Sequence, residues 1–207
     1  MLHDRDKYTF HHCIGVGVIA TLAGKWCGLE SDELAGLASA GAMHDVGKAF
    51  IAPEILGKPG RLTPEEFAAI KRHTILGQEV LAGVLGPESV AAAVALEYHE
   101  RRDGTGYPDG LKGDESRLES RIVAVADVFH AMTSERTYRH RRLDLAVLAQ
   151  LRTDGFGLLD PVVVQTFLAR MIPSSFGSRV RLSDGRIGRI AFISEQYPER
   201  PLIEMDE

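Results

Sequence analysis

Hydrophobic positions recur at helical spacing through most of the chain. In residues 8–27, Val16, Ala20 and Ala23 fall on the same helical face as His12. The run Thr63-Pro64-Glu65-Glu66 is typical of a helix start, because the threonine caps and the glutamate completes a capping box. The whole pattern predicts helices over residues 8–27, 31–45, 63–84, 87–99, 118–133, 143–153 and 161–171, with loops over 46–62 and 101–114.

The pattern changes after residue 172. Residues 173–177 form a linker, and residues 180–193 alternate apolar and polar positions around Ser183-Asp184-Gly185, which indicates a β-hairpin. Leu202 and Ile203 are candidates for a third strand. We therefore expect a mainly α protein, with a helical domain over residues 1–172 and a linker with a small β subdomain over residues 173–207.

Composition narrows the class of protein. The chain has 207 residues, and 24 basic against 29 acidic side chains give a net charge of −5. This balance does not favour a nucleic acid polymer as partner. No apolar run approaches the roughly 20 residues of a membrane span, and no signal peptide opens the chain. A cytoplasmic location is expected.

Six polar residues stand out at five positions, about one to a helix and 26 to 32 residues apart: His12, the adjacent His44 and Asp45, His73, His99 and Asp127. Several lie on otherwise apolar faces, where an unpaired polar group is costly. A single such histidine is more commonly a hydrogen-bonded core residue than a metal ligand, but mutual metal ligation would satisfy the whole set at once.

The ligand types narrow the metal. Imidazole and carboxylate without thiolate suit Fe(II), Mn(II), Ni(II) or Zn(II). Asp45 has two oxygens and can bridge two ions, an arrangement suited to phosphoryl displacement. Lys48, three residues on, would then face the phosphate and stabilise its charge.

These residues lie in motifs that resemble the HD-GYP family, the branch of the HD superfamily that hydrolyses the bacterial messenger cyclic di-GMP. The similar segments are YTFHH at 8–12, HDVGK at 44–48, ILGKPGRLTPEEF at 55–67, KRHTILGQEVL at 71–81, HERRDGTGYPDGLKGD at 99–114 and RIVAVADVFHAMTSERTYR at 121–139. They occur in the family's order and span roughly residues 4–172. The resemblance implies an HD-type five-helix core with extra helices.

The resemblance also implies roles for individual residues. A first metal ion would be held by His12, His44, Asp45 and Asp127, and a second by Asp45, His73 and His99. Lys48 would contact a phosphate or the attacking water, Gly106 and Tyr107 would shape the nucleotide pocket, and Arg136 and Arg139 would contact phosphate and guanine. Two divalent metal ions are therefore expected as cofactors, Fe or Mn first, with Ni or Zn as alternatives.

Four departures from the family pattern bear on this set. The family has two adjacent histidines before the glutamate of its GYP motif, whereas this chain has Tyr98 and then His99. Tyr98 is a poor ligand as a neutral phenol, so we expect a weaker or altered second site. Tyr8 stands where relatives with three metals carry a glutamate, which favours two ions. His130 and Thr137 replace a common aspartate and a common proline and are milder differences.

The leading hypothesis is a metal-dependent phosphodiesterase that converts cyclic di-GMP to linear pGpG and, in a second round, to GMP. One alternative is a catalytically weak or inactive receptor for cyclic di-GMP, or a protein-interaction module. A phosphohydrolase for another nucleotide is disfavoured by the GYP motif. The sequence leaves open a homodimer, a protein partner at the GYP loop, and whether the protein stands alone or belongs to a longer chain with a sensory domain.

Overall fold

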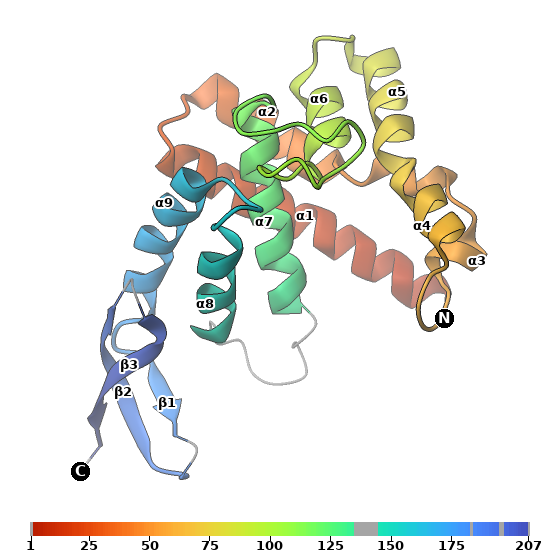
Figure 1. The fold of residues 1–207 in the computed structure, drawn as a ribbon. Helices are drawn as coiled ribbons and strands as arrows, with labels where there is room; N and C mark the ends of the chain where they lie inside the picture. The colour runs from red at the N-terminus through yellow and green to blue at the C-terminus, as the bar shows by residue number, and fades with distance from the viewer. Residues whose placement is uncertain (1, 135–144, 183, 195–196, 207) are drawn as a thin grey trace.

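The protein is mainly helical, with a small antiparallel sheet at the C-terminus (Figure 1). This computed structural model describes residues 2–134, 145–182, 184–194 and 197–206, apart from the side chains of residues 2–8 and 199. The elements are α1 Leu2–Trp26, α2 Ser31–Met43, η1 Val46–Phe50, α3 Pro53–Leu56, α4 Pro64–Lys71, α5 His73–Leu85, α6 Val90–Glu97, α7 Leu118–Ser134, α8 Leu145–Asp154, α9 Pro161–Met171, η2 Ile172–Ser175, β1 Arg179–Arg181, β2 Ile187–Ser194 and β3 Tyr197–Met205. Among the described helices, none has the length and hydropathy needed to cross a bilayer.

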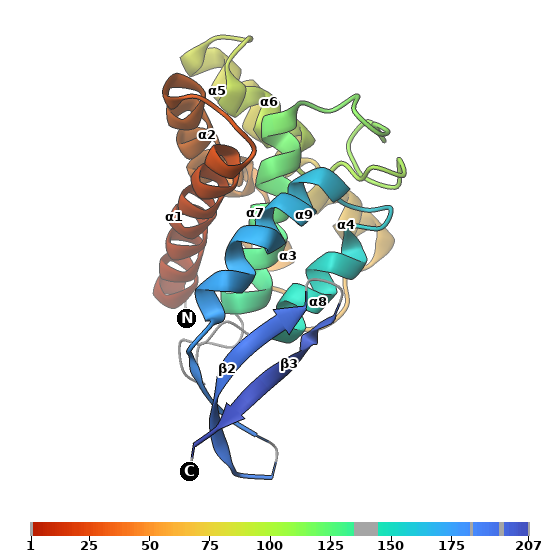
Figure 2. The same ribbon diagram turned by 90° about the vertical axis from the view of Figure 1, so that its left-hand side faces the viewer.

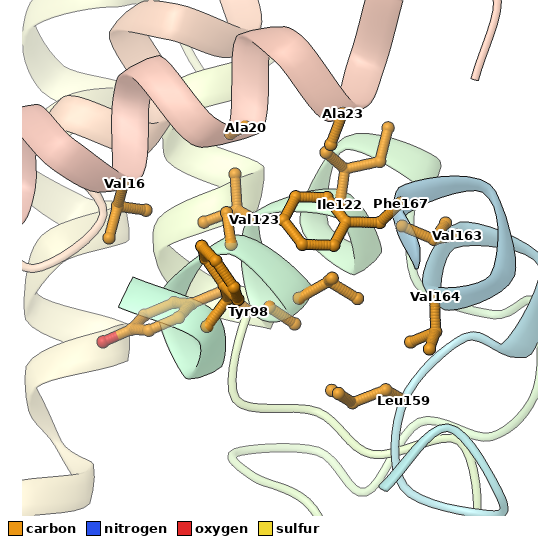
Figure 3. Packing of buried hydrophobic residues seen from close by; sticks show 14 of the residues in the cluster. Val16, Ala20, Ala23, Tyr98, Ile122, Val123, Leu159, Val163, Val164 and Phe167 are labelled. Carbon is orange, nitrogen blue, oxygen red and sulfur yellow. The ribbon is translucent and has the colours of Figure 1, made fainter. Parts of the chain in front are cut away.

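One hydrophobic core joins the helices that carry the predicted site residues. Helix α1 packs against α2 and α7, and α6 packs against α2, α5 and α7. Val16 and Ala20 of α1 meet Ile122 and Val123 of α7 in this core, and all four are fully buried (Figure 3). Full burial of a valine or isoleucine side chain contributes about 1.5–3 kcal/mol. The predicted apolar faces therefore orient these helices and the polar residues among them.

The helix expected over residues 63–84 is divided into α4 and α5 at Arg72, which corrects that prediction. His73 Nδ1 donates to the carbonyl of Ile70 at 2.6 Å, and Thr74 Oγ1 donates to the carbonyl of Lys71 at 3.0 Å. Side chains that bond nearby carbonyls compete with the helical hydrogen-bond ladder. As a result His73 begins α5 and its ring is fixed to the preceding turn.

The C-terminal segment forms the expected small sheet, with strand order β1-β2-β3 and antiparallel pairing. Gly185 has a positive φ in the turn between β1 and β2, as a tight hairpin turn requires. Figure 2 shows β2 and β3 beside α8, and β3 contacts this helix. Ile190 and Ile193 of β2 are buried in the same core cluster as the helices. The predicted domain boundary at residues 172 and 173 stays a prediction.

Candidate metal centre

The first predicted ligand set is drawn together where α1, α2 and α7 meet. His12 lies on α1 and Asp127 on α7, while His44 and Asp45 occupy the turn between α2 and η1. His12 Nε2 is 3.0 Å from Asp127 Oδ1, and His44 Nε2 is 3.9 Å from the same oxygen and 3.4 Å from Asp45 Oδ2. The ligand atoms of His12, His44 and Asp127 all lie within 4.8 Å of one another. That spacing fits a single divalent ion.

The ring of His44 is oriented for ligation. Its Nδ1 is 2.7 Å from the carbonyl of Gly41, and a carbonyl accepts only, so Nδ1 carries the proton. In the neutral ring, Nε2 then presents a lone pair toward the carboxylates. This buried atom has no hydrogen-bond partner among the described residues. A buried polar atom without a partner is rare and costly, and a cation would satisfy it.

The second predicted set is close to the first but is arranged differently. His73 Nε2 is 3.8 Å from Asp45 Oδ1. The His99 ring lies 5.2 Å from that of His73, centroid to centroid, and stacks on Tyr107 at 4.6 Å. Asp45 thus faces both sets, with Oδ2 toward His44 and Oδ1 toward His73. The predicted bridging position of Asp45 is compatible with this geometry.

The Tyr98 hydroxyl lies between Asp45 and His73, a position that could not be predicted from the sequence. Its side chain is buried, with 1% of its surface exposed, and its hydroxyl points away from the apolar cluster (Figure 3). The hydroxyl donates to Asp45 Oδ1 at 2.6 Å and is 2.7 Å from His73 Nε2. The residue treated from sequence as a missing ligand is therefore bonded to two members of the second set.

The carboxylates of the centre are held in their charged form. Burial acts to raise the pKa of Asp45, but the nearby His44 ring, 3.4 Å from Oδ2, and the Lys48 ammonium outweigh it and hold this pKa well below its usual value. Burial likewise opposes ionisation of Asp127, yet the hydrogen bond with His12 and the charge of His44 lower its pKa. Two ionised carboxylates at one buried point favour a cation between the surrounding nitrogens.

The pKa values of His73 and His99 are lowered, whereas that of His44 is raised. Burial lowers the pKa of His99 to about 3, and burial is also the main cause of the lowered pKa of His73. Both rings are therefore neutral near pH 7, the form that binds metals. For His44, burial opposes the charge, but the neighbouring carboxylates of Asp45 and Asp127 raise its pKa.

Lys48 lies at the rim of the centre. Its ammonium is 2.7 Å from Asp45 Oδ2, and its side chain is 36% exposed, so it can also reach an incoming anion. Gly47 allows η1 to approach α5, since a Cβ there would lie 1.9 Å from the carbonyl oxygen of His73. Close approach of two backbones is therefore the structural reason for a glycine at this position.

The loop between α6 and α7 carries Gly106 and Tyr107, and Glu100 organises it. The buried Glu100 carboxylate accepts hydrogen bonds from the backbone N–H groups of residues 109, 110 and 111, at 2.7 to 3.1 Å. A Cβ on Gly106 would lie 2.4 Å from the Cα of Glu100, so only glycine fits there. This loop sets Tyr107 against His99, beside the second set.

His130 was missed as a neighbour of the site. Its Nδ1 is 3.0 Å from Nδ1 of His12, on the opposite side of the His12 ring from Asp127. The spacing from Asp127 to His130 is one helical turn, which places both on one face of α7 and could have indicated the contact. Arg136, Thr137 and Arg139, like the side chain of Tyr8, lie outside the described residues.

Helices that converge on a cluster of histidines and aspartates form a helical protein with a candidate metal site. A family model described as an HD domain matches residues 6–161. The chain therefore belongs to the HD domain family, and its HD-type helical fold is confirmed.

The relation to HD-GYP proteins expected from the motifs is also confirmed. The cyclic di-GMP phosphodiesterase response regulator RpfG of Xanthomonas campestris is 43% identical over 151 residues, which are 72% of this chain and 40% of that protein. The 3'3'-cGAMP-specific phosphodiesterase 1 of Vibrio cholerae is 41% identical over 65% of this chain and 31% of its own length. The chain thus spans less than half the length of these curated relatives.

A solved structure has the same fold. Bd1817, described as a HDG"Y"P protein from Bdellovibrio bacteriovorus, superposes with a TM-score of 0.64 over 79% of this chain and 52% of that one. The identity of 19% means that this likeness concerns the fold alone.

Proposed function

We propose that this chain is a metal-dependent phosphodiesterase that hydrolyses cyclic di-GMP to linear pGpG and, in a second round, to GMP. The observation that carries the proposal is the group of buried His12 and His44 with half-buried Asp127, whose ligand atoms lie within 4.8 Å of one another beside the Asp45–Lys48 pair. HD-domain relatives named as phosphodiesterases support the same reaction class.

The residues present fit a first divalent ion. The unpartnered Nε2 of His44, within the described residues, is the lone pair that such an ion would use, with His12, Asp127 and Asp45 Oδ2 around it. When bound, the ion supplies Lewis acidity that activates water and offsets phosphate charge. Fe or Mn is proposed first, with Ni or Zn as alternatives, because these metals accept mixed nitrogen and oxygen ligands. A second ion on Asp45, His73 and His99 stays a prediction.

The chain's own groups have distinct tasks in this proposal. Asp45 orients the Lys48 ammonium through the 2.7 Å ion pair, and Lys48 stabilises charge that develops on the phosphate oxygens. Gly106 keeps the loop close to Glu100, and Tyr107 forms a wall of the nucleotide pocket next to His99. Arg136 and Arg139 are proposed to contact phosphate and guanine, since a guanidinium matches both groups through paired hydrogen bonds.

The test is a product assay under anaerobic, reducing conditions. Protein loaded separately with Mn(II) or Fe(II) receives cyclic di-GMP, and products are followed by chromatography. We expect metal-dependent pGpG or GMP from the unaltered chain, none from Asp127→Asn, and normal product from Asp32→Asn. Asp32 is a matched control, because it is an exposed aspartate in the first turn of α2. Product that persists in Asp127→Asn would contradict this site.

The substrate is tested by comparing two cyclic dinucleotides. The two curated relatives are named for cyclic di-GMP and for 3'3'-cGAMP, two cyclic dinucleotides. We propose cyclic di-GMP and expect a higher kcat/KM for it than for 3'3'-cGAMP in parallel assays. A higher kcat/KM for 3'3'-cGAMP would mean that this compound is the preferred substrate of the same centre.

A receptor without turnover is the second candidate. The observation in its favour is the Tyr98 hydroxyl, which bonds Asp45 and His73 of the second set. Binding of cyclic di-GMP in calorimetry, without product in either metal, would favour this candidate. A homodimer and a protein partner at the GYP loop stay predictions, testable by sedimentation and by loop variants.

A further inference from the structure

The second ligand set holds a hydroxyl where an ion is expected. Asp45 Oδ1 and His73 Nε2 are 3.8 Å apart. An ion bound by both at about 2.0–2.2 Å would have to lie between them. The Tyr98 oxygen contacts both of these atoms, at 2.6 and 2.7 Å.

The contact between the Tyr98 hydroxyl and His73 involves the only ring nitrogen of His73 that could bind an ion. Nδ1 of His73 is committed to the carbonyl of Ile70 at 2.6 Å, so the neutral ring has only the lone pair on Nε2 for an ion. Nε2 is the atom that faces the Tyr98 hydroxyl. An ion therefore binds His73 only after this contact is broken.

Tyr98 cannot leave the position easily. Its ring is in contact with His44 and His99, with centroid distances of 4.8 and 4.0 Å, and the side chain is 1% exposed. A rotation that removed the hydroxyl would carry the ring through closely packed core, and such interiors yield little. The hydroxyl is thus a fixed part of the centre.

The first set does not depend on the same atoms. It uses Oδ2 of Asp45, which is 3.4 Å from His44 Nε2, whereas Tyr98 bonds Oδ1. The geometry therefore separates the first set, where His44 Nε2 has no hydrogen-bond partner among the described residues, from a second position already bonded by a neutral phenol.

We propose that the Tyr98 hydroxyl closes the second metal position, so that the chain binds one divalent ion tightly and a second ion only weakly. The inference rests on the proposed metal centre but not on the substrate. In this inference Tyr98 determines how many ions bind tightly, because its hydroxyl competes with the second ion for Asp45 Oδ1 and His73 Nε2.

The test counts bound ions without any hydrolysis assay. The metal-free chain is titrated with Mn(II), and the free ion is measured by its EPR signal. For the unaltered chain we expect one tight ion and a second at least tenfold weaker. Tyr98→His should bind two ions tightly, because it supplies a nitrogen ligand. Tyr98→Phe should strengthen the second site, because the competing hydroxyl is gone, and Tyr197→Phe, an exposed tyrosine on β3, should behave as the unaltered chain.

Several results would overturn the inference. Two ions of equal affinity in the unaltered chain would show that the hydroxyl does not compete. A second site weakened by Tyr98→Phe, or a phenolate-to-iron absorption band in Fe(III)-loaded chain, would make Tyr98 a ligand instead. Absence of any tight ion would refute the metal centre itself, whereas normal ion counts without turnover would refute only the proposed reaction. Circular dichroism checks folding, and Tyr98→Phe carries the test if Tyr98→His does not fold.

Discussion

Tyr98 has one hydroxyl proton and two neighbours able to receive it, Asp45 and His73. In the metal-free chain this hydroxyl is the bonded partner of Asp45 Oδ1, at a place where an unpaired carboxylate oxygen would be expensive. The residue therefore affects stability as well as ion binding. These two effects have opposite signs, which allows them to be separated.

We predict that Tyr98→Phe destabilises the metal-free chain. Removing the hydroxyl leaves a buried acceptor without its donor, which costs about 1–3 kcal/mol. Urea unfolding in the presence of a chelator measures the change in unfolding free energy. Tyr197→Phe serves as control and should stay within about 0.5 kcal/mol, as exposed substitutions do. Equal stability of both variants would mean that the Tyr98 contacts contribute nothing.

A second prediction at this scale concerns Lys48. Lys48→Ala should lower kcat by about 10²–10³, the usual effect of removing one preorganised donor, while the bound metal content stays the same. Lys58→Ala is the matched control, because Lys58 also pairs with a carboxylate, Glu66, at 2.6 Å but away from the centre. Lost metal in Lys48→Ala would instead indicate that Lys48 acts by holding Asp45 in place.

At the scale of elements, the approach of η1 to α5 is what brings Asp45 to His73. Gly47 permits this approach because a Cβ would meet the carbonyl oxygen of His73 at 1.9 Å and the backbone nitrogen of Gly77 at 2.6 Å. Neither atom can move without displacing α5 itself. The closeness of the two ligand sets therefore depends on the absence of a side chain at Gly47.

We predict that Gly47→Ala lowers the unfolding free energy by about 1–3 kcal/mol or more, as overpacking does. It should also weaken metal binding, because η1 and α5 must separate. Gly83→Ala on α5 is the matched control: its Cβ would meet no atom within 4 Å, and alanine favours a helix by about 0.5–1 kcal/mol. Similar melting temperatures for the two variants would contradict the argument.

The elements show what the sequence could and could not predict. Apolar periodicity located the helices, and the motifs on them placed His12, His44 and Asp127 near one point. The Tyr98 hydroxyl could not be placed, because its bond to Asp45 joins residues 53 positions apart. The division at Arg72 likewise depends on side-chain bonds to carbonyls that hydrophobic spacing does not report. Glu100 orients the loop through bonds to three backbone N–H groups, which hydrophobic spacing does not report either.

At the scale of the whole molecule, the buried centre makes the metal-free chain sensitive to acid. Burial lowers the pKa of folded His99 to about 3, against about 6.5 when unfolded. Between these values the unfolded chain binds the additional proton, so stability rises with pH. The His99 contribution is fully present above about pH 6.5 and is lost as the pH falls toward 3. His73 acts in the same direction, whereas the raised pKa of His44 acts in the opposite one.

We predict that His99→Gln flattens the pH dependence of stability between about pH 6.5 and 4, since glutamine does not titrate. Urea unfolding with chelator at a series of pH values measures the slope for both proteins. Variant His11→Gln is the control, because His11 is exposed on α1. An unchanged slope in His99→Gln would place the acid sensitivity elsewhere.

The C-terminal sheet raises the question of whether the molecule unfolds as one unit. Ile190 and Ile193 of β2 are buried, at 4% and 2% exposure, in the cluster that also contains Val16 and Ile122. A sheet of this size lacks a core large enough for independent stability. Together with the contacts between β3 and α8, this predicts that the sheet unfolds with the helical body.

We predict that Ile193→Ala destabilises the whole chain by about 2–5 kcal/mol in a single cooperative transition, because it removes buried methyl groups from the shared core. Leu202→Ala is the control, since Leu202 on β3 is 65% exposed. Calorimetry and the near-ultraviolet signal of Trp26 on α1 report on the helical body directly. Because Trp26 is far along the chain from β2, a shift of its transition in Ile193→Ala would show that strand and helices unfold together. If its transition did not move, the boundary at residues 172 and 173 would separate two folding units.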